Sequence, residues 1–365
     1  MIIKSLELSN FRNYGLLDME FDRGTNILYG DNAQGKTNIL EAIYLSATTK
    51  SHRGTKDRDI VNFNEEEAHI RLWLEKQGDD IRIDMHLRKN KTKGIAIDGA
   101  RIKKASQLLG LLNVVFFSPE DLAIIKEGPA QRRHFVDMEL CQLDSLYLHD
   151  LNHYNRIINQ RNKLLKEMAS QSQLRDMLDV WDMQLADYGA KIIKRRITFV
   201  EQLNGIIRAI HDNLSGQKEA LEIVYEPDAK AEDLAEKLAS GRERDIRLKQ
   251  TCAGPHRDDF AFAANGIDLR RFGSQGQQRT AALSLKLSEI ELVRQMTGDT
   301  PVLLLDDVLS ELDSSRQNFL LGSIGDIQTI VTCTGLDDFV NNRFEINRIF
   351  RVENGTVRHQ NIEVK

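Results

Sequence analysis

Short continuous runs of apolar residues mark the strands that this chain is expected to bury. Residues 25–29 form one such run, residues 302–305 form a second that follows Pro301, and residues 329–334 form a third. A continuous apolar run bounded by polar residues or Pro is typical of a central strand in a parallel sheet that is covered on both faces. Residues 1–4 are expected to lead directly into a strand. We therefore expect an α/β fold.

Apolar residues at helical spacing predict the helices that accompany these strands. One helix follows the first buried run at residues 38–45, and another covers residues 280–296. The helix at 280–296 carries apolar side chains at helical spacing, at Ala282, Leu283, Leu285, Leu287, Ile290, Leu292 and Val293. Each of these helices begins just after a glycine-containing segment.

The middle of the chain has a different character and predicts a helical hairpin. Two long apolar series at helical spacing cover residues 143–168 and 178–214, and polar residues 171–173 separate them. Ser215-Gly216 is expected to end the second helix. An acidic, alanine-rich helical stretch follows at residues 226–243.

Length supports a division of the chain into lobes. At 365 residues the chain is longer than one compact core usually extends. We expect a mainly helical arm lobe inserted into an α/β head. The predicted division is residues 1–110 for the first part of the head, residues 111–249 for the arm lobe and residues 250–365 for the second part of the head.

The glycine-rich loop after the first buried run carries the clearest chemistry. Residues 30–37, Gly-Asp-Asn-Ala-Gln-Gly-Lys-Thr, fit the pattern GxxxxGK[ST] of a phosphate-binding loop and lie between a predicted strand and a predicted helix. Backbone N–H groups and the helix N-terminus would bind phosphate oxygens. Lys36 is expected to reach the β- and γ-phosphates of ATP, and Thr37 to bind Mg²⁺. The residues expected to contact the nucleotide are Gly30, Asp31, Asn32, Ala33, Gln34, Gly35, Lys36, Thr37 and Asn38.

Two adjacent carboxylates end the apolar run at residues 302–305. Asp306 would lie at the C-terminal end of a central strand and hold Mg²⁺ through water, which is the Walker B role. Asp307 would either orient or deprotonate the attacking water, and the sequence leaves both roles open. Lys36, Asp306 and Asp307 are the predicted catalytic residues.

A second helix start offers another place for an anion. Residues 272–279, Phe-Gly-Ser-Gln-Gly-Gln-Gln-Arg, open the helix predicted at 280–296. Ser274 is a natural N-cap, and Gly276 lets a backbone amide approach an anion closely. Because one ATP does not need two such helix starts from one chain, we expect two copies to close on the same γ-phosphate. The nucleotide contacts predicted in this segment are Ser274, Gly276 and Gln277.

These motifs resemble those of ABC-type ATPases. Residues 274–278, Ser-Gln-Gly-Gln-Gln, are similar to the Leu-Ser-Gly-Gly-Gln signature of that class, and residues 310–313, Ser-Glu-Leu-Asp, follow Asp306 at the offset of its D-loop. The resemblance implies an ABC-type P-loop ATPase head, a mixed sheet with flanking helices. The class usually carries a switch histidine near residues 329–334, where this chain has none. Either Thr332 or Thr334 could supply a hydroxyl contact instead.

Over nearly its whole length, the chain resembles the RecF family of SMC-like ABC ATPases. Residues 3–14 are similar to the opening strand of SMC-like heads, and residues 119–137 and 304–313 resemble signatures of the RecF family. By this resemblance Arg12 is a candidate phosphate contact, with an ordinary surface arginine as the alternative.

The resemblance implies a DNA-binding protein of recombinational repair that acts in gap repair, replication restart and SOS induction. Such a protein forms a homodimer on binding ATP and Mg²⁺ and clamps single-stranded and gapped DNA at junctions. It helps load RecA together with RecO and RecR. Its weak, DNA-dependent ATPase activity would time the opening of the dimer. The preferred DNA structure, the turnover rate and the surface that meets RecR do not follow from the sequence.

Charge limits how such a protein could meet DNA. A net charge of −5 argues against broad affinity for nucleic acid, so DNA contact requires a local basic patch. Three clusters are candidates, and each could also be an ordinary solvated surface. They are residues 53–58, residues 88–104, and the group Lys191, Lys194, Arg195 and Arg196. Since no aromatic residues alternate with these charges, we expect contact with the phosphate backbone.

The remaining features favour a cytoplasmic protein. No apolar run reaches membrane-spanning length, and Cys141, Cys252 and Cys333 lack metal-ligand spacing. Two other functional classes remain open. A small-molecule phosphotransferase could use the same phosphate loop, but it would act as a monomer and leave residues 274–279 without a role. An ATPase subunit of a membrane permease would co-purify with membranes.

Overall fold

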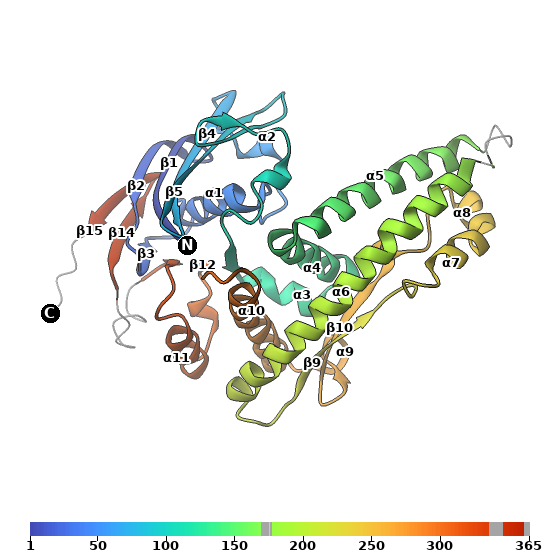
Figure 1. Ribbon diagram of the computed structural model, residues 1–365. Helices are drawn as coiled ribbons and strands as arrows, with labels where there is room; N and C mark the ends of the chain where they lie inside the picture. Colours follow the sequence, from blue (N-terminus) through green and yellow to red (C-terminus); the bar gives the residue numbers. More distant parts are fainter. Residues whose placement is uncertain (169–174, 176, 336–345, 361–365) are drawn as a thin grey trace. The chain divides into compact units, whose positions relative to one another are not determined.

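The chain folds into two compact units (Figure 1). A computed structural model describes residues 1–168, 175, 177–335 and 346–360. The first unit comprises residues 1–121 and 286–365, and the second comprises residues 122–285. The polar break predicted at residues 171–173 lies outside the described residues.

One layer of the first unit is a six-stranded antiparallel sheet. Its strand order is β2-β1-β4-β5-β6-β7. In β4, buried Ala68, Ile70 and Leu72 alternate with exposed residues. This alternation leaves one face of the sheet for the core and the other for solvent. The strands are β1 (Ile2–Phe11), β2 (Tyr14–Glu20), β4 (Glu67–Lys76), β5 (Asp79–Arg88), β6 (Gly94–Ile97) and β7 (Ala100–Arg101).

A second six-stranded sheet contains the three buried runs predicted from the sequence. Its order is β15-β14-β3-β13-β12-β8, and all neighbours pair in parallel except β14 and β15. The predicted strands at 25–29, 302–305 and 329–334 are therefore confirmed, and the structure places them as consecutive strands of one sheet. The strands are β3 (Thr25–Tyr29), β8 (Val114–Phe117), β12 (Val302–Asp306), β13 (Thr329–Cys333), β14 (Arg348–Glu353) and β15 (Thr356–Gln360).

Helix α1 (Lys36–Thr48) packs against both sheets of the first unit. Its side chains Ile39, Leu40 and Ile43 share one buried core with Ile70 of the antiparallel sheet and Leu304 of the parallel sheet. Because α1 follows β3 directly, its N-terminus lies at the C-terminal edge of the parallel sheet. The other helices of this unit are α2 (Asp57–Ile60), α11 (Ser314–Ser323) and the C-terminal part of α10 (Gln275–Thr297).

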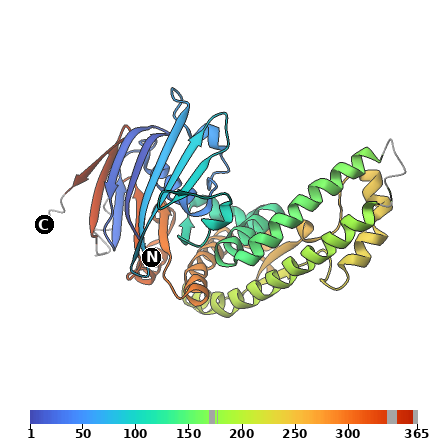
Figure 2. The same cartoon turned by 45° about the horizontal axis from the view of Figure 1, so that its top comes forward.

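The second unit is built on the predicted helical hairpin. Helices α5 (Ser145–Glu167) and α6 (Leu178–Ser215) lie side by side (Figures 1 and 2). Gly216 ends α6 in the left-handed conformation, with φ of 65°, as the sequence predicts. A small antiparallel sheet of order β11-β10-β9 adjoins the helices. The other elements are α3 (Leu122–Lys126), α4 (Pro129–Leu143), β9 (Leu221–Glu226), α7 (Leu234–Ser240), α8 (Arg242–Leu248), β10 (Asp259–Ala264), β11 (Ile267–Asp268) and α9 (Leu269–Phe272).

The second unit and the predicted arm lobe have different bounds. The unit covers residues 122–285, whereas the predicted arm lobe covers residues 111–249. Strand β8 pairs with β12, which keeps residues 114–117 in the first unit. Strand β10 pairs with β9, which keeps residues 259–264 in the second unit. Helical periodicity reveals neither pairing, and this is why the two divisions differ.

The predicted fold class is confirmed. The first unit combines a mostly parallel sheet, an antiparallel sheet and flanking helices, and the second unit is mainly helical, as an α/β head with an inserted arm lobe predicts. In the described part of the chain, every helix is too short or too polar to cross a lipid bilayer.

Candidate nucleotide site

A hollow of about 370 Å³ lies where the parallel strands of the first unit end. The C-terminal edge of a parallel sheet is the usual binding place for ligands in open α/β folds. The hollow brings together the phosphate loop and both predicted carboxylates. Its lining residues are Asn32, Ala33, Gln34, Gly35, Lys36, Thr37, Asn38, Arg53, Pro119, Glu120, Asp306, Asp307 and Thr332.

Two glycines of the phosphate loop are required by its backbone. Gly30 has φ of 150°, and a Cβ atom there would lie 2.3 Å from the carbonyl oxygen of Val352. Gly35 has φ of 115°, and its Cβ would lie 2.6 Å from the amide of Asn13. The Asn13 amide also donates a hydrogen bond to the carbonyl of Gln34 at 2.9 Å. The turn between β1 and β2 therefore holds the loop closely, and larger side chains would displace it.

The start of α1 is prepared to bind an anion. Gly35 occupies the N-cap position, and no side chain among the described residues caps this helix. The first N–H groups of a helix lack partners within the helix, and the helix dipole places partial positive charge there. An uncapped N-terminus at the edge of a hollow is a suitable place for phosphate oxygens.

The ammonium group of Lys36 is held inside the loop. Its Nζ donates to the carbonyl oxygens of Gly30 at 2.5 Å and Asp31 at 2.8 Å. An ammonium group has three protons, so one remains that can be donated to a ligand in the hollow. Burial lowers the pKa of Lys36, while the nearby charges of Asp307 and Asp306 act in the opposite direction.

Oxygen ligands suited to Mg²⁺ converge at the end of β12. The hydroxyl groups of Thr37 and Thr332 both donate to Oδ1 of Asp306, at 2.8 and 2.7 Å. These two hydrogen bonds fix the orientation of the carboxylate. Mg²⁺ prefers oxygen ligands from one or two protein groups and completes its shell with water and phosphate oxygens. The residues present therefore fit Mg²⁺, with Thr37 and Asp306 as the groups that would hold it.

Asp307 has an unusual backbone conformation next to Asp306. Its φ is 52°, in the left-handed region that non-glycine residues rarely adopt. Its N–H donates to the hydroxyl oxygen of Thr332 at 3.0 Å. Strained backbone positions of this kind persist where surrounding contacts hold them, as they do here. Thr332, one of the two residues considered in place of a switch histidine, thus contacts both Asp306 and Asp307.

Arg12 is engaged elsewhere in the first unit. Its guanidinium forms a two-point ion pair with the buried carboxylate of Glu41, at 2.8 and 2.7 Å. It also donates to the backbone of Asp59 and to the hydroxyl of Thr55. Arg12 is not among the described residues that line the hollow. Its contact with phosphate stays a prediction.

The predicted signature segment belongs to the second unit and begins α10. The hydroxyl of Ser274 accepts a hydrogen bond from the N–H of Gln277 at 3.2 Å, and Oε1 of Gln277 accepts one from the N–H of Ser274 at 2.8 Å. This reciprocal pair is a capping box. Gly276 is exposed, and a Cβ atom there would have its nearest neighbour, the Ser274 hydroxyl oxygen, at 3.9 Å. The side chain of Gln277 thus serves the helix cap, while the Gly276 backbone faces open space.

Three residues that the sequence analysis did not assign to the nucleotide also line the hollow: Arg53, Pro119 and Glu120. Arg53 lies in the loop after α1 and donates to the amide oxygen of Asn38 at 3.3 Å. Glu120 follows β8, and β8 pairs in parallel with β12. The apolar run at 114–117 before Pro119 was the available signal for this neighbouring strand.

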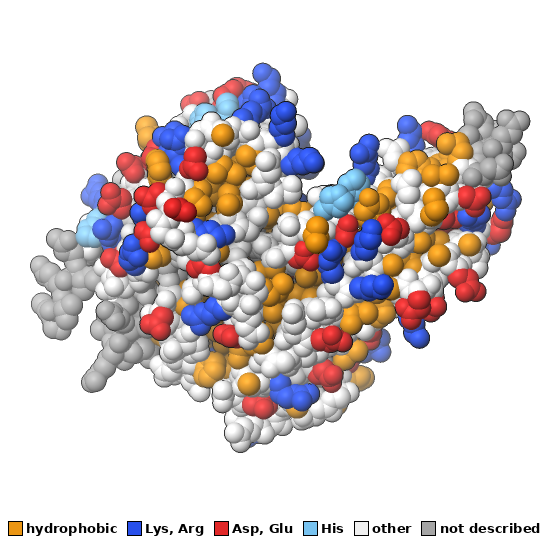
Figure 3. Space-filling view, viewed as in Figure 1, with side chains coloured by type: hydrophobic (Ala, Val, Ile, Leu, Met, Phe, Trp, Pro, Cys, Tyr) orange, Lys and Arg blue, Asp and Glu red, His pale blue; other side chains and the backbone are white. Residues whose placement is uncertain are grey.

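The structure removes Arg196 from the basic cluster predicted at residues 191–196, because this side chain is buried, whereas Lys191 and Lys194 stay exposed. Contact of the remaining cluster with DNA stays a prediction. Arg196 is 2% exposed and pairs with Asp137 and Asp258, both at 2.8 Å. Arg195 pairs with Asp144 and Asp150, and Lys191 pairs with Asp187. Only Lys194 is left as an exposed cation without a described acidic partner. On the second unit, basic side chains stand among acidic ones (Figure 3).

Comparison with known sequences agrees with these motifs. A family described as "RecF/RecN/SMC N terminal domain" matches residues 2–358. The "DNA replication and repair protein RecF" of Lachnospira eligens is 61% identical to this chain, over 99% of the chain and 100% of the relative. The protein of the same description from Lachnoclostridium phytofermentans is 62% identical, over 98% of the chain and 99% of the relative.

Comparison with solved structures agrees with the fold. A structure described as the recombination mediator protein RecF with ATP in the RecFOR pathway has a TM-score of 0.93 and 38% identity. The match covers 99% of this chain and 98% of that one. An SMC head bound to the C-terminal winged-helix domain of ScpA has a TM-score of 0.58 at 16% identity, which shows a shared fold alone.

Proposed function

This chain belongs to the RecF/RecN/SMC family, and on that premise we propose that it is an ATP-dependent DNA-binding protein of recombinational repair. ATP binding joins two copies around DNA, and slow hydrolysis separates them. One observation carries this proposal. The phosphate loop and both carboxylates share one hollow, while the exposed start of α10 in the other unit is a second place for an anion.

ATP is the nucleotide that the hollow would hold. The third proton of the Lys36 ammonium and the uncapped start of α1 would bind its phosphates. Thr37 and Asp306 would hold Mg²⁺, which neutralises phosphate charge when bound. Asp307 would orient or deprotonate the attacking water from its place beside Asp306. The ATP-bound structure of a protein 38% identical to this chain supports the choice of nucleotide.

Dimerisation would complete the site. Ser274 and the backbone N–H of Gly276 from a second copy would contact the γ-phosphate bound in the hollow of the first. The exposure of both residues supports this role. Because α10 is already capped within its own chain, its first turn is formed before a partner arrives.

DNA contact would come from the hairpin of β5, β6 and β7. Lys91, Arg101, Lys103 and Lys104 are exposed there. Lys93, in contrast, pairs with Asp57 at 3.0 Å. Cations that project to solvent from a hairpin suit contact with phosphates and predict salt-sensitive binding. If each exposed cation meets one phosphate, replacing one with Ala lowers the slope of affinity against salt concentration by about one.

The partners are proposed from the relatives. The chain would act at single-strand/double-strand junctions of gapped DNA, in gap repair, replication restart and SOS induction. It would work with RecO and RecR to help load RecA. The description of a similar structure as a recombination mediator in the RecFOR pathway supports this assignment.

Molar mass by light scattering on the Asp307→Asn protein tests the central step. We expect a monomer without nucleotide and a dimer with Mg-ATP, because the substitution slows hydrolysis without removing the phosphate contacts. A monomer in both conditions would contradict the sandwich and favour a phosphotransferase.

Ser274→Arg in the same background is the matched control. It is expected to retain ATP binding by the monomer, because Ser274 belongs to a different unit from the phosphate loop. It should nevertheless stay monomeric with Mg-ATP and release gapped DNA. Loss of ATP binding by the monomer would instead mean that Ser274 acts on the nucleotide of its own chain.

A further inference from the structure

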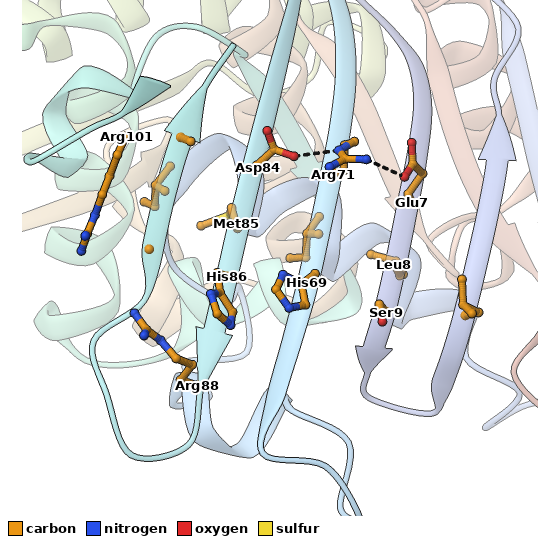
Figure 4. A pocket seen from close by; sticks show the side chains of 15 residues that line it. Glu7, Leu8, Ser9, His69, Arg71, Asp84, Met85, His86, Arg88 and Arg101 are labelled. Carbon is orange, nitrogen blue, oxygen red and sulfur yellow. Dashed lines mark hydrogen bonds and ion pairs between the residues drawn. The ribbon is translucent and has the colours of Figure 1, made fainter. Parts of the chain in front are cut away.

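A second hollow, of about 500 Å³, lies on the solvent face of the antiparallel sheet in the first unit (Figure 4). Side chains from β1, β4, β5 and β6 line it, and this lining shares no described residue with the nucleotide hollow. Two histidines, His69 of β4 and His86 of β5, lie next to each other in this groove. The function proposed above gives these residues no role.

Strand register brings three metal-ligating side chains together here. His69 and His86 are directly opposite each other on neighbouring antiparallel strands, and their ring centroids are 4.2 Å apart. Glu67 precedes His69 by two positions and therefore projects from the same face of β4. The available ligand atoms of Glu67, His69 and His86 all lie within 4.8 Å of one another.

Neighbouring carboxylates are occupied by arginines. Asp84 accepts hydrogen bonds from Arg71 at 2.7 Å and from Arg82 at 2.8 Å. Glu7 accepts one from Arg71 at 3.2 Å. Arg88, which is opposite Glu67 in the register, directs one guanidinium nitrogen to the carbonyl of Thr92. Glu67 contacts Nε2 of His86 at 2.5 Å, and its carboxylate lies within 4.8 Å of the nearest ligand atom of His69 as well.

We propose that Glu67, His69 and His86 form a binding site for a divalent transition-metal ion such as Zn²⁺. Two imidazole nitrogens and one carboxylate oxygen suit Zn²⁺ and its neighbours in the first transition row, whereas Mg²⁺ and Ca²⁺ prefer oxygen ligands alone. The groove leaves the solvent side open for water to complete the coordination. The ion would connect β4 to β5 at the edge of the groove.

The side chains need only a small adjustment to hold the ion. Ligand atoms at about 2.0–2.2 Å from a tetrahedral Zn²⁺ lie roughly 3.4 Å from one another. The present ligand atoms lie within 4.8 Å of one another. Rotation of the imidazole rings about χ2, a torsion with a broad energy well, is the adjustment that we expect. The rings stack at 20° in the present arrangement. Metal binding therefore exchanges a stacked pair for a chelating pair without moving the strands.

The first test is calorimetric titration of the full chain with Zn²⁺ in excess Mg²⁺, which occupies oxygen-only sites. We expect the double variant His69→Ala/His86→Ala to bind one equivalent of Zn²⁺ fewer than the unmodified protein. The matched control is His149→Ala/His153→Ala, because these two histidines on α5 also lie close, with ring centroids 4.4 Å apart. The control should retain the equivalent that the first variant loses. Equal stoichiometry and affinity in all three proteins would overturn the proposal.

A second variant separates metal binding from the cross-strand hydrogen bond. Glu67→Gln can still hydrogen-bond to His86 but removes the anionic ligand. We expect its affinity for Zn²⁺ to fall by about tenfold or more, since changes beyond the direct ligands already cost this much. Zn²⁺ should raise the Tm of the unmodified protein and raise that of Glu67→Gln less, because it binds only the folded sheet. Unchanged affinity in Glu67→Gln would mean that Glu67 forms a hydrogen-bonded pair and no metal site.

Discussion

Charged side chains gather in both units, but their surroundings differ. In the second unit, the Arg196 guanidinium donates to Asp137 and Asp258, to the hydroxyl of Tyr147 and to the carbonyl of Pro255. Tyr225 also donates to Asp258. In the first unit, Lys36, Asp306 and Asp307 border a hollow of about 370 Å³. Arg196 and Asp137 also border a hollow, of about 230 Å³. We call the Arg196 cluster closed because its guanidinium donates to groups of its own unit, and the Lys36 cluster open because one ammonium proton is left for a ligand.

These different surroundings distinguish charged side chains that stabilise the fold from charged side chains that bind a ligand. A buried guanidinium must have partners for its donors, because an isolated charge in the interior is very costly. Arg196 finds these hydrogen-bond partners within its own unit. Lys36 satisfies two of its three protons with loop carbonyls and keeps one toward the hollow. The number of partners within the chain therefore indicates which cluster awaits a ligand.

Removing the centre of the closed cluster should have the largest effect on stability. Arg196→Ala leaves the buried carboxylate of Asp258 without its cation, and we expect the unfolding free energy of the second unit to fall by about 3–5 kcal/mol. The chain has one tryptophan in each unit, Trp73 and Trp181. In a Trp73→Phe background, urea unfolding followed by fluorescence therefore reports on the second unit through Trp181.

Lys194→Ala is the control for that experiment. Lys194 lies on the same helix but is exposed. Its removal should change the unfolding free energy by less than about 0.5 kcal/mol. Equal effects of Arg196→Ala and Lys194→Ala would contradict the structural role of the closed cluster.

Replacing Lys36 of the open cluster should lower ATP affinity strongly and stability only slightly, whereas replacing Arg196 should mainly lower stability. Lys36→Ala removes a charged hydrogen bond to the nucleotide, so the Kd for ATP should rise by roughly 30–150-fold, or about 2–3 kcal/mol. The unfolding free energy should change by less than about 1 kcal/mol, because burial of this charge is itself unfavourable, as its lowered pKa indicates. Calorimetric titration with ATP and urea unfolding measure the two quantities. Lys50→Ala, an exposed lysine after α1, should leave both unchanged. A large loss of stability in Lys36→Ala would place this lysine among the structural charges.

The sequence predicted the open cluster well because its motifs are local. A strand, a glycine-rich loop and a helix start are contiguous at residues 25–45, and Asp306 directly ends an apolar run. The meeting of these two segments followed from the rule that parallel strands end at a common edge. The capping box of Ser274 and Gln277 was also readable, since its residues are three positions apart.

The closed cluster could not be predicted from the sequence. Arg196 belongs to a run of basic residues that is compatible with an exposed surface, and its partners Asp137 and Asp258 are about 60 residues away in either direction. Helical periodicity places Arg196 on a face but does not show which charges pack against it. The bounds of the second unit could not be predicted from helical periodicity either, because they depend on the pairing of β9 with β10.

His256 also lies in the second unit. Its protonation should lower the unfolding free energy of that unit by less than Arg196→Ala does. Nε2 of His256 lies 3.0 Å from the carbonyl of Thr251, which can only accept, so Nε2 carries the proton and Nδ1 accepts from the hydroxyl of Tyr154 at 2.8 Å. Burial lowers the pKa of His256 to about 4 from an ordinary value of 6.5, and Arg257 acts in the same direction. Because the folded-state pKa lies below the unfolded one, the stabilisation is complete above pH 6.5 and is lost as the pH falls toward 4.

At pH 5, protonation of His256 should lower the unfolding free energy by up to about 2 kcal/mol. Urea unfolding of the Trp73→Phe protein at pH 7.5 and pH 5.0 measures it. His256→Asn can keep the hydrogen bond to Thr251 and removes the titrating group, so its stability should vary less with pH. His153→Asn, at another histidine of the second unit, on α5, should vary as the parent does. The same pH dependence in all three proteins would assign the effect to other groups.

Substitutions of Ser274 should change the unfolding free energy least of all. They also distinguish a structural role from a binding role, because Ser274 is proposed to have both. As the N-cap of α10 it stabilises its own unit, and as an exposed residue it is proposed to meet the γ-phosphate of a second copy. Ser274→Ala removes the cap and should cost about 1 kcal/mol of unfolding free energy. Ser274→Asp restores an equally good cap, so its stability should match that of the parent.

Dimerisation should rank these two variants in the reverse order. Ser274→Ala keeps the Gly276 backbone available and should still form some dimer with Mg-ATP in the Asp307→Asn background. Ser274→Asp places a carboxylate against the γ-phosphate and should remain a monomer because the two negative charges repel. If Ser274→Asp is the more stable variant in urea unfolding but forms less dimer in light scattering, the role of Ser274 as a helix cap is distinct from its contact with the second copy. If dimer formation instead follows stability, Ser274 acts only by starting its helix, and the contact to phosphate belongs to the Gly276 backbone alone.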